Sequence, residues 1–220
     1  MRPRSLPLIA ALALMACTPT HMRLPPDLGP DLKEAVVVGR GDLKPGFTLG
    51  DFSITEQTGG WTTGESSMVA GTTSAHEYTP YTFVLLGPGA TKVRVACRAN
   101  SASVGAQVAP GTTVSAVLAD HLSCTVGDGL LDLDRPSGTA VHGRLKLVDR
   151  LIGVEPVKGI EGSDWAVVSG VRFVESGRSL GAFETMNAGR LVTPASLPVD
   201  DQARLAAIAV AILGWPAGGN

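Results

Sequence analysis

A run of nine apolar residues near the C-terminus, from Leu205 to Leu213, restricts the fold more than any other feature. It follows Asp200 and Asp201, whose charges suit the positive end of a helix dipole, and it stops before Gly214. We therefore expect a helix over about 200–213. Such a helix is about 20 Å long, too short to cross a bilayer of roughly 30 Å. Because it is apolar on all sides, protein must surround it.

Strand patterns dominate the chain before this helix. Gly (27) and Pro (15) are plentiful and only 17% of residues are charged, which is typical of a β-rich domain with many turns. Residues 99–110 are small and polar and indicate an exposed excursion, whereas 114–122 fits a short helix or a strand. A meander of three strands is predicted over 171–174, 180–186 and 191–193. We expect a mainly β fold, an antiparallel barrel or sandwich with one buried apolar C-terminal helix.

The N-terminus has the parts of a secretory signal: basic Arg2 and Arg4, an apolar stretch over 6–16, and small Ala16 directly before Cys17. A cysteine in this place resembles the lipobox of bacterial lipoproteins. The resemblance implies cleavage before Cys17 and lipidation of that residue. Because the following residue is not aspartate, it also implies an outer-membrane anchor in a Gram-negative cell. An ordinary secretory signal is the alternative, since the apolar stretch is too short for a membrane-spanning helix.

The domain organisation follows from this signal. Residues 1–16 form the predicted signal peptide. Residues 17–34 contain several prolines without a strand or helix period, which predicts a lipidated cysteine followed by a Pro-rich tether stiffened towards polyproline II. A single β-rich globular domain is expected over 35–220.

Charge and composition limit the expected partners. The mature chain has 16 basic and 20 acidic residues, a formal charge of −4, and no basic stripe, so nucleic-acid binding is not expected. The expected partners are the membrane, through lipidated Cys17, and an envelope protein. No cofactor is expected.

Cys97 and Cys124 remain after the lipobox cysteine is set aside. Each lies on the apolar face of an alternating segment, over 92–98 and 122–126. In an oxidising compartment this pattern favours a disulfide that closes a loop of about 28 residues, although two buried free thiols are the alternative.

One motif is typical of the active sites of hydrolases. Gly177 to Gly181 matches G-x-S-x-G and would present Ser179 as a nucleophile. All four histidines precede Ser179, which excludes the order of the α/β-hydrolases. A dispersed site combining Ser179 or His121 with Asp149 stays open, and a turn in the meander is the plainer reading.

Two further motifs are weaker. Asp120, His121 and Cys124 are three possible metal ligands, but they lack the spacing of a zinc site and fit a strand end. The tripeptide Arg40-Gly41-Asp42 occurs in adhesive ligands and equally in ordinary turns.

The segment Phe52-Ser53-Ile54-Thr55-Glu56-Gln57-Thr58-Gly59 resembles the F-x-I-x-D-x-x-G strand and turn of tubby-like, scramblase and LURP-one-like proteins. The meander, the stretch 197–201 and the hydrophobic helix also resemble the C-terminus of that family. The resemblance implies a twelve-stranded barrel around a buried C-terminal helix. The cysteine pair and residues 99–110 depart from the family pattern, so no lipid-headgroup residues are carried over.

These observations predict a non-catalytic interaction or structural module of the envelope rather than an enzyme. The alternatives are a hydrolase with a dispersed site and a small-ligand or lipid carrier. A helix that filled a barrel would leave little room for such a ligand.

Overall fold

The computed structural model describes residues 20–39, 46–59, 63–69, 72–109, 112–136 and 140–215. Within these ranges it contains one α-helix, α1 (Val199–Gly214), and two 3-10 helices, η1 (Pro26–Leu28) and η2 (Pro88–Ala90). The strands form one antiparallel sheet. They are β1 (Leu32–Val38), β2 (Thr48–Leu49), β3 (Phe52–Gly59), β4 (Thr63–Val69), β5 (Thr72–Leu86), β6 (Lys92–Ala109), β7 (Thr112–Val126), β8 (Gly129–Asp134), β9 (His142–Lys146), β10 (Leu151–Lys158), β11 (Val168–Glu175), β12 (Arg178–Glu184) and β13 (Arg190–Pro194).

The sheet closes because β3 pairs with β2 on one side and with β5 on the other. The ring runs β3-β2-β1-β13-β12-β11-β10-β9-β8-β7-β6-β5 and forms a 12-stranded antiparallel barrel, while β4 extends the sheet beyond β5. The expected mainly β fold with one buried helix is confirmed, and the barrel is the alternative that forms. The resemblance to tubby-like proteins implies the same architecture, and membership of that family stays a prediction.

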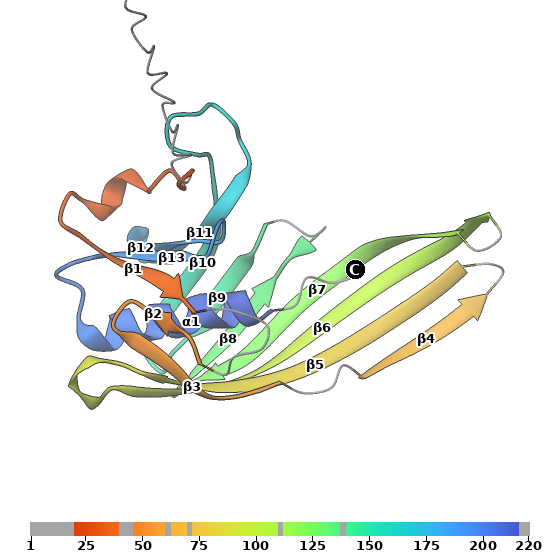
Figure 1. The fold of residues 1–220 in the computed structure, drawn as a ribbon, viewed down its shortest axis with the longest axis horizontal. Helices are drawn as coiled ribbons and strands as arrows, with labels where there is room; N and C mark the ends of the chain where they lie inside the picture. The colour runs from red at the N-terminus through yellow and green to blue at the C-terminus, as the bar shows by residue number, and fades with distance from the viewer. Residues whose placement is uncertain are drawn as a thin grey trace, which may run out of the picture.

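The helix α1 supplies the centre of the core, and Figure 1 shows the strands arranged around it. Leu205 and Ile208 are fully buried, as are Phe173 and Phe183 on the strands. A Cβ at Gly181 would lie 3.0 Å from Leu205 Cδ1, so a larger residue would require the helix side chain to shift, and glycine allows β12 to pack closely on α1. Among the described helices, none combines the length and apolar character needed to cross a membrane.

Polar contacts fix both ends of α1. At its N-terminal end, Arg150 donates to Glu175 Oε1 of β11 at 2.6 Å and to Asp201 Oδ1 at 2.8 Å. At its C-terminal end, the hydroxyl of Tyr81 donates to the carbonyl of Ala211 at 2.7 Å. The helix is therefore held in the barrel by hydrogen bonds as well as by apolar packing.

The predicted meander is present as β11, β12 and β13. The segment 99–110, expected as an excursion, continues β6 as a strand up to residue 109, with two shifts in its register against β7. The segment 114–122, open between helix and strand, lies within β7. Both belong to the longest strands of the fold.

Candidate functional site

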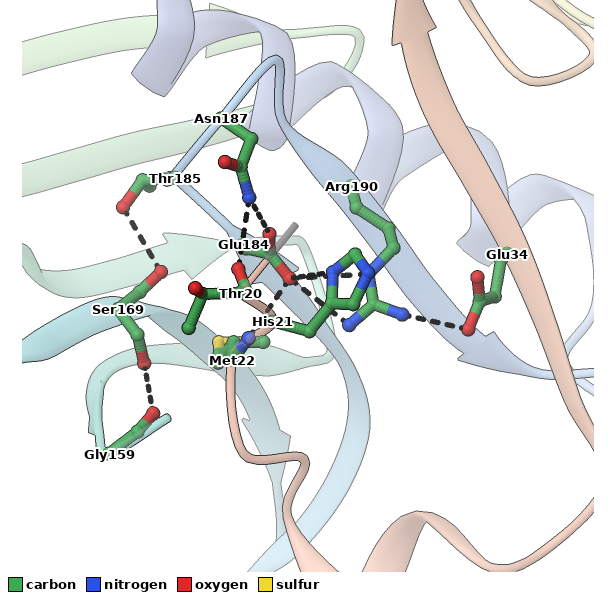
Figure 2. Close-up of polar contacts among 10 residues, drawn as sticks. All are labelled: Thr20, His21, Met22, Glu34, Gly159, Ser169, Glu184, Thr185, Asn187 and Arg190. Carbon is green, nitrogen blue, oxygen red and sulfur yellow. Dashed lines mark hydrogen bonds and ion pairs between the residues drawn. The ribbon is translucent and has the colours of Figure 1, made fainter. Parts of the chain in front are cut away.

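A buried carboxylate, Glu184 at the end of β12, holds the first described residues of the chain against the barrel (Figure 2). Its Oε2 accepts hydrogen bonds from the backbone N–H of Met22 at 3.0 Å and from Nε and Nη2 of Arg190 at 3.2 and 3.1 Å. Its Oε1 accepts one from Nδ2 of Asn187 at 3.0 Å. The ring nitrogen Nδ1 of His21 lies 3.3 Å from Oε2. Both carboxylate oxygens are thus occupied by donors.

The charge of Glu184 is stabilised by the donors around it. Burial raises the pKa of Glu184, but the Met22 N–H, Asn187 and Arg190 outweigh burial, so the pKa of Glu184 lies below its ordinary value. Arg190 also donates from Nη1 to Glu34 Oε1 at 2.9 Å. A carboxylate that is ionised, paired and saturated with donors acts as a fixed anchor for the segments around it.

The residues before β1 lie on the barrel. Asn187 donates from Nδ2 to the carbonyl of Thr20 at 3.0 Å. Met22 is fully buried and Leu28 is 5% exposed, both in a small apolar cluster that includes β10 and β12 residues. The interpretation of 17–34 as a free tether is therefore wrong for its described part, because apolar side chains between the prolines pack on the strands.

The serine of G-x-S-x-G contributes to the same attachment. Ser179 is 7% exposed. Its backbone N–H donates to Asp27 Oδ2 at 2.8 Å, and its hydroxyl donates to Asp27 Oδ1 at 2.9 Å. These hydrogen bonds from Ser179 lower the pKa of Asp27. None of the described polar contacts of Ser179 involves a histidine, so the geometry favours a structural role.

The other candidate catalytic and ligand residues are not brought together. His121 Nδ1 lies 2.9 Å from Asp134 Oδ1, while Asp149 is exposed in the turn between β9 and β10. Asp120 pairs with Arg135, and Cys124 is in a disulfide. Among the described residues, no group of three potential ligands is placed to hold a metal ion.

A four-stranded arm projects from the barrel and is its most distinctive surface (Figure 1). It consists of β4 and the outer parts of three further strands: residues 72–80 of β5, 99–109 of β6 and 112–120 of β7. β5, β6 and β7 have 15, 18 and 15 residues, whereas no other strand exceeds eight. Apart from Ala99, Gly105 and Asp120, the arm side chains whose burial is described are half-buried or exposed. Neither face of the arm is covered by another element of the described chain.

The root of the arm is reinforced from inside the barrel. Cys97 and Cys124 form a disulfide between directly opposite positions of β6 and β7, which confirms the prediction from sequence. Next to it, Asp120 Oδ1 accepts a hydrogen bond from Trp215 Nε1 at 2.8 Å, and the guanidinium of Arg135 stacks 4.4 Å from the Trp215 ring. These contacts join the arm to the end of α1.

Internal space for a small ligand is limited by α1. An open depression of about 270 Å³ lies outside the barrel, at the N-terminal end of the helix, and is lined in part by Lys92, Asp128, Asp200 and Arg204. Its charges are mixed, and Arg204 is already bound to Asp201 at 3.1 Å. The depression therefore offers no excess of either charge to a ligand.

Some sequence predictions fall outside the described residues: Cys17 and the signal peptide, and the tripeptide 40–42. The pair Glu184–Arg190 was not recognised in the sequence. The sequence signal is two opposite charges close to the connection between the second and third strands of the predicted meander, and the structure places them at directly paired positions.

No protein-family model, curated protein or solved structure matches the chain. Its function is therefore inferred from the residues and their geometry.

Proposed function

We propose that the chain is an envelope lipoprotein, anchored to the outer membrane through lipidated Cys17, and that it serves as a non-catalytic interaction module. The arm is the surface that binds the partner. The proposal rests above all on one observation, a four-stranded sheet that projects from the barrel with both faces open.

Isolated sheets need a covered face or a partner to be stable, and large exposed apolar side chains mark interaction surfaces. The arm carries Met68, Val69, Val114 and Leu118 at 71%, 74%, 60% and 63% exposure. The barrel supports this sheet at its root through the disulfide, so the arm is presented as a stiff extension rather than as a loop.

The two other functions have less support. A hydrolase needs a base next to its nucleophile, and Ser179 is bound to Asp27 instead. A lipid carrier needs a cavity, and the described barrel core is packed around α1.

Photo-crosslinking in intact cells tests the arm. A benzoyl-phenylalanine at Leu118 or Met68 should yield protein adducts. The same group at Leu151 or Val148, which are 51% and 89% exposed on the barrel, should not. Adducts formed at the barrel positions and absent from the arm would overturn the proposal.

Membrane fractionation tests the anchor separately. Cys17→Ala should leave the chain uncleaved or release it from the membrane fraction, with no lipid-dependent mass increase. A Cys17→Ala chain that is processed and retained like the wild type would exclude lipidation as the means of anchoring.

A further inference from the structure

Both long edges of the arm have no partner strand within the described chain. β4 pairs with β5 on its inner side only. β8 pairs with β7 from His121 onwards, and the carbonyl of Asp120 accepts from the N–H of Arg135 at 2.8 Å, so the free part of the β7 edge is residues 112–119. Each edge therefore presents a row of backbone N–H and C=O groups that an added strand can use.

The edges lack the usual chemical protection against strand addition, and the bulge that β7 makes at Leu118 lies beyond the stretch 114–117. Natural edge strands are commonly blunted by charged residues or proline. The stretches 66–75 and 99–119 contain no charged residue at all, and Glu65 is the one charge on β4. The exposed side chains of both edges are instead small, hydroxylic or apolar, which favours pairing.

The number of strands makes the two edges complementary. Because the arm is an antiparallel set of four, β4 and β7 run in opposite directions. A second copy in the same orientation can therefore place its β7 antiparallel to β4 of the first. The pairing through the sheet aligns Val69 with Val114, and Ser67 with Ala116, at the same height on the two edges.

We propose that the arms of two copies join edge to edge, β4 of one against β7 of the other, in a continuous antiparallel sheet. When the two arms stand at the same height, Val69 of β4 lies opposite Val114 on β7 of the neighbour. Ser67 of β4 then lies opposite Ala116 on β7 of the neighbour. All side chains paired over 66–69 are uncharged. A single peptide strand would satisfy one edge, whereas a copy of the chain fits both.

The orientation of the copies rests on the proposed function, because anchors in one membrane make all copies stand the same way up. Pairing of unlike edges leaves one β4 edge and one β7 edge free in every assembly that has not closed on itself. The contact therefore repeats, and it gives a ring if the rotation between neighbours closes, or an open array if it does not. The twist of β-sheets supplies such a rotation between successive arms.

Cysteine crosslinking of the full-length chain in its membrane tests this contact. Ser67→Cys and Ala116→Cys are made in differently tagged copies, and a mild oxidant is added. A mixed disulfide dimer should form when both variants are present and in neither variant alone. A chain carrying both substitutions should give a ladder of oligomers. Val148→Cys, in an exposed turn of the barrel, is the control and should give no dimer.

An added charge provides the second test. Val69→Lys places a cation at the outer end of the contact, opposite Val114 of the neighbour, and should abolish the mixed dimer, while the melting temperature of the domain stays within the error of the wild type. Retention of the dimer in Val69→Lys would overturn the proposed register.

Two other outcomes overturn the proposal. Dimers formed by Ala116→Cys alone would indicate a two-fold contact between two β7 edges. Absence of every crosslink would exclude self-association through the arm. If photo-adducts to another protein at Leu118 persisted in that case, the proposed function would stand without this inference; loss of both would remove both.

Discussion

Replacing Glu184 with glutamine should lower the free energy of unfolding by about 3 kcal/mol, the lower end of the cost of breaking a buried ion pair. The Glu184 side chain is 2% exposed and that of Arg190 is 11% exposed. Glutamine keeps the shape of the side chain but turns one acceptor into a donor, and in either orientation its NH2 group faces a donor: Asn187 Nδ2 on one side, or the N–H groups of Met22 and Arg190 on the other. Glu34 still accepts from Arg190 Nη1, and this remaining contact keeps the cost from rising further.

The chain offers a matched control. Arg172 donates from Nε and Nη2 to Glu155 Oε2 at 3.0 and 2.7 Å, and these side chains are 40% and 48% exposed. Glu155→Gln should cost less than about 1 kcal/mol, because solvent screens the pair. Urea unfolding of a chain that begins at Thr18 measures both variants, with the slope m expected to stay constant. Equal losses in the two variants would refute the reasoning from burial.

Acid titration checks the sign of the same interaction. The folded state lowers the pKa of Glu184, so its contribution is complete above the unfolded value of about 4.3 and is lost as pH falls through the lower folded pKa. The wild type should therefore lose stability more steeply than Glu184→Gln below about pH 4. Parallel curves for the two proteins would contradict this account.

Three further changes probe the core. Ile208→Asp buries an unpaired charge beside fully buried neighbours and should abolish cooperative unfolding by circular dichroism; a soluble, cooperatively folding variant would contradict the enclosed helix. Tyr81→Phe removes the donor to the Ala211 carbonyl and should cost about 1–2 kcal/mol in urea unfolding. Replacing both Cys97 and Cys124 with serine should cost about 3–4 kcal/mol and make stability insensitive to reductant.

The helix and its enclosure could be predicted from sequence, because an apolar surface on every side has one physical solution. The observed bounds, Val199–Gly214, differ from the expected 200–213 by one residue at each end. The choice between barrel and sandwich could not be predicted. It depends on the pairing of β3 with β5, and β4 lies between these strands in the chain. No local pattern records which distant edges meet.

The arm could not be predicted from the sequence for a different reason. Its strands contain serine, threonine, alanine and glycine on both faces, so they lack the alternation that marks a half-buried strand. Pairing with neighbours on the long hairpins, rather than burial, defines them as strands. For the N-terminal segment, the sequence pattern led to the prediction of a tether where the structure has packed residues. Prolines at 25, 26 and 30 indicate extended backbone, but they do not tell whether Met22 and Leu28 are solvated or packed.

The packing of that segment changes what a lipid on Cys17 would do. Two residues, Thr18 and Pro19, lie between Cys17 and Thr20, and the three steps along the chain span about 10 Å even when fully extended. With Cys17 as the anchor, the barrel end that carries Glu184 and Asn187 would lie close to the membrane surface, instead of swinging on a long tether. The rigid root at Cys97–Cys124 then transmits this orientation to the arm. Copies anchored in this way would approach one another with their arms already aligned. The anchor and the Glu184 cluster together would therefore reduce the rotational entropy that the copies lose when their arms pair.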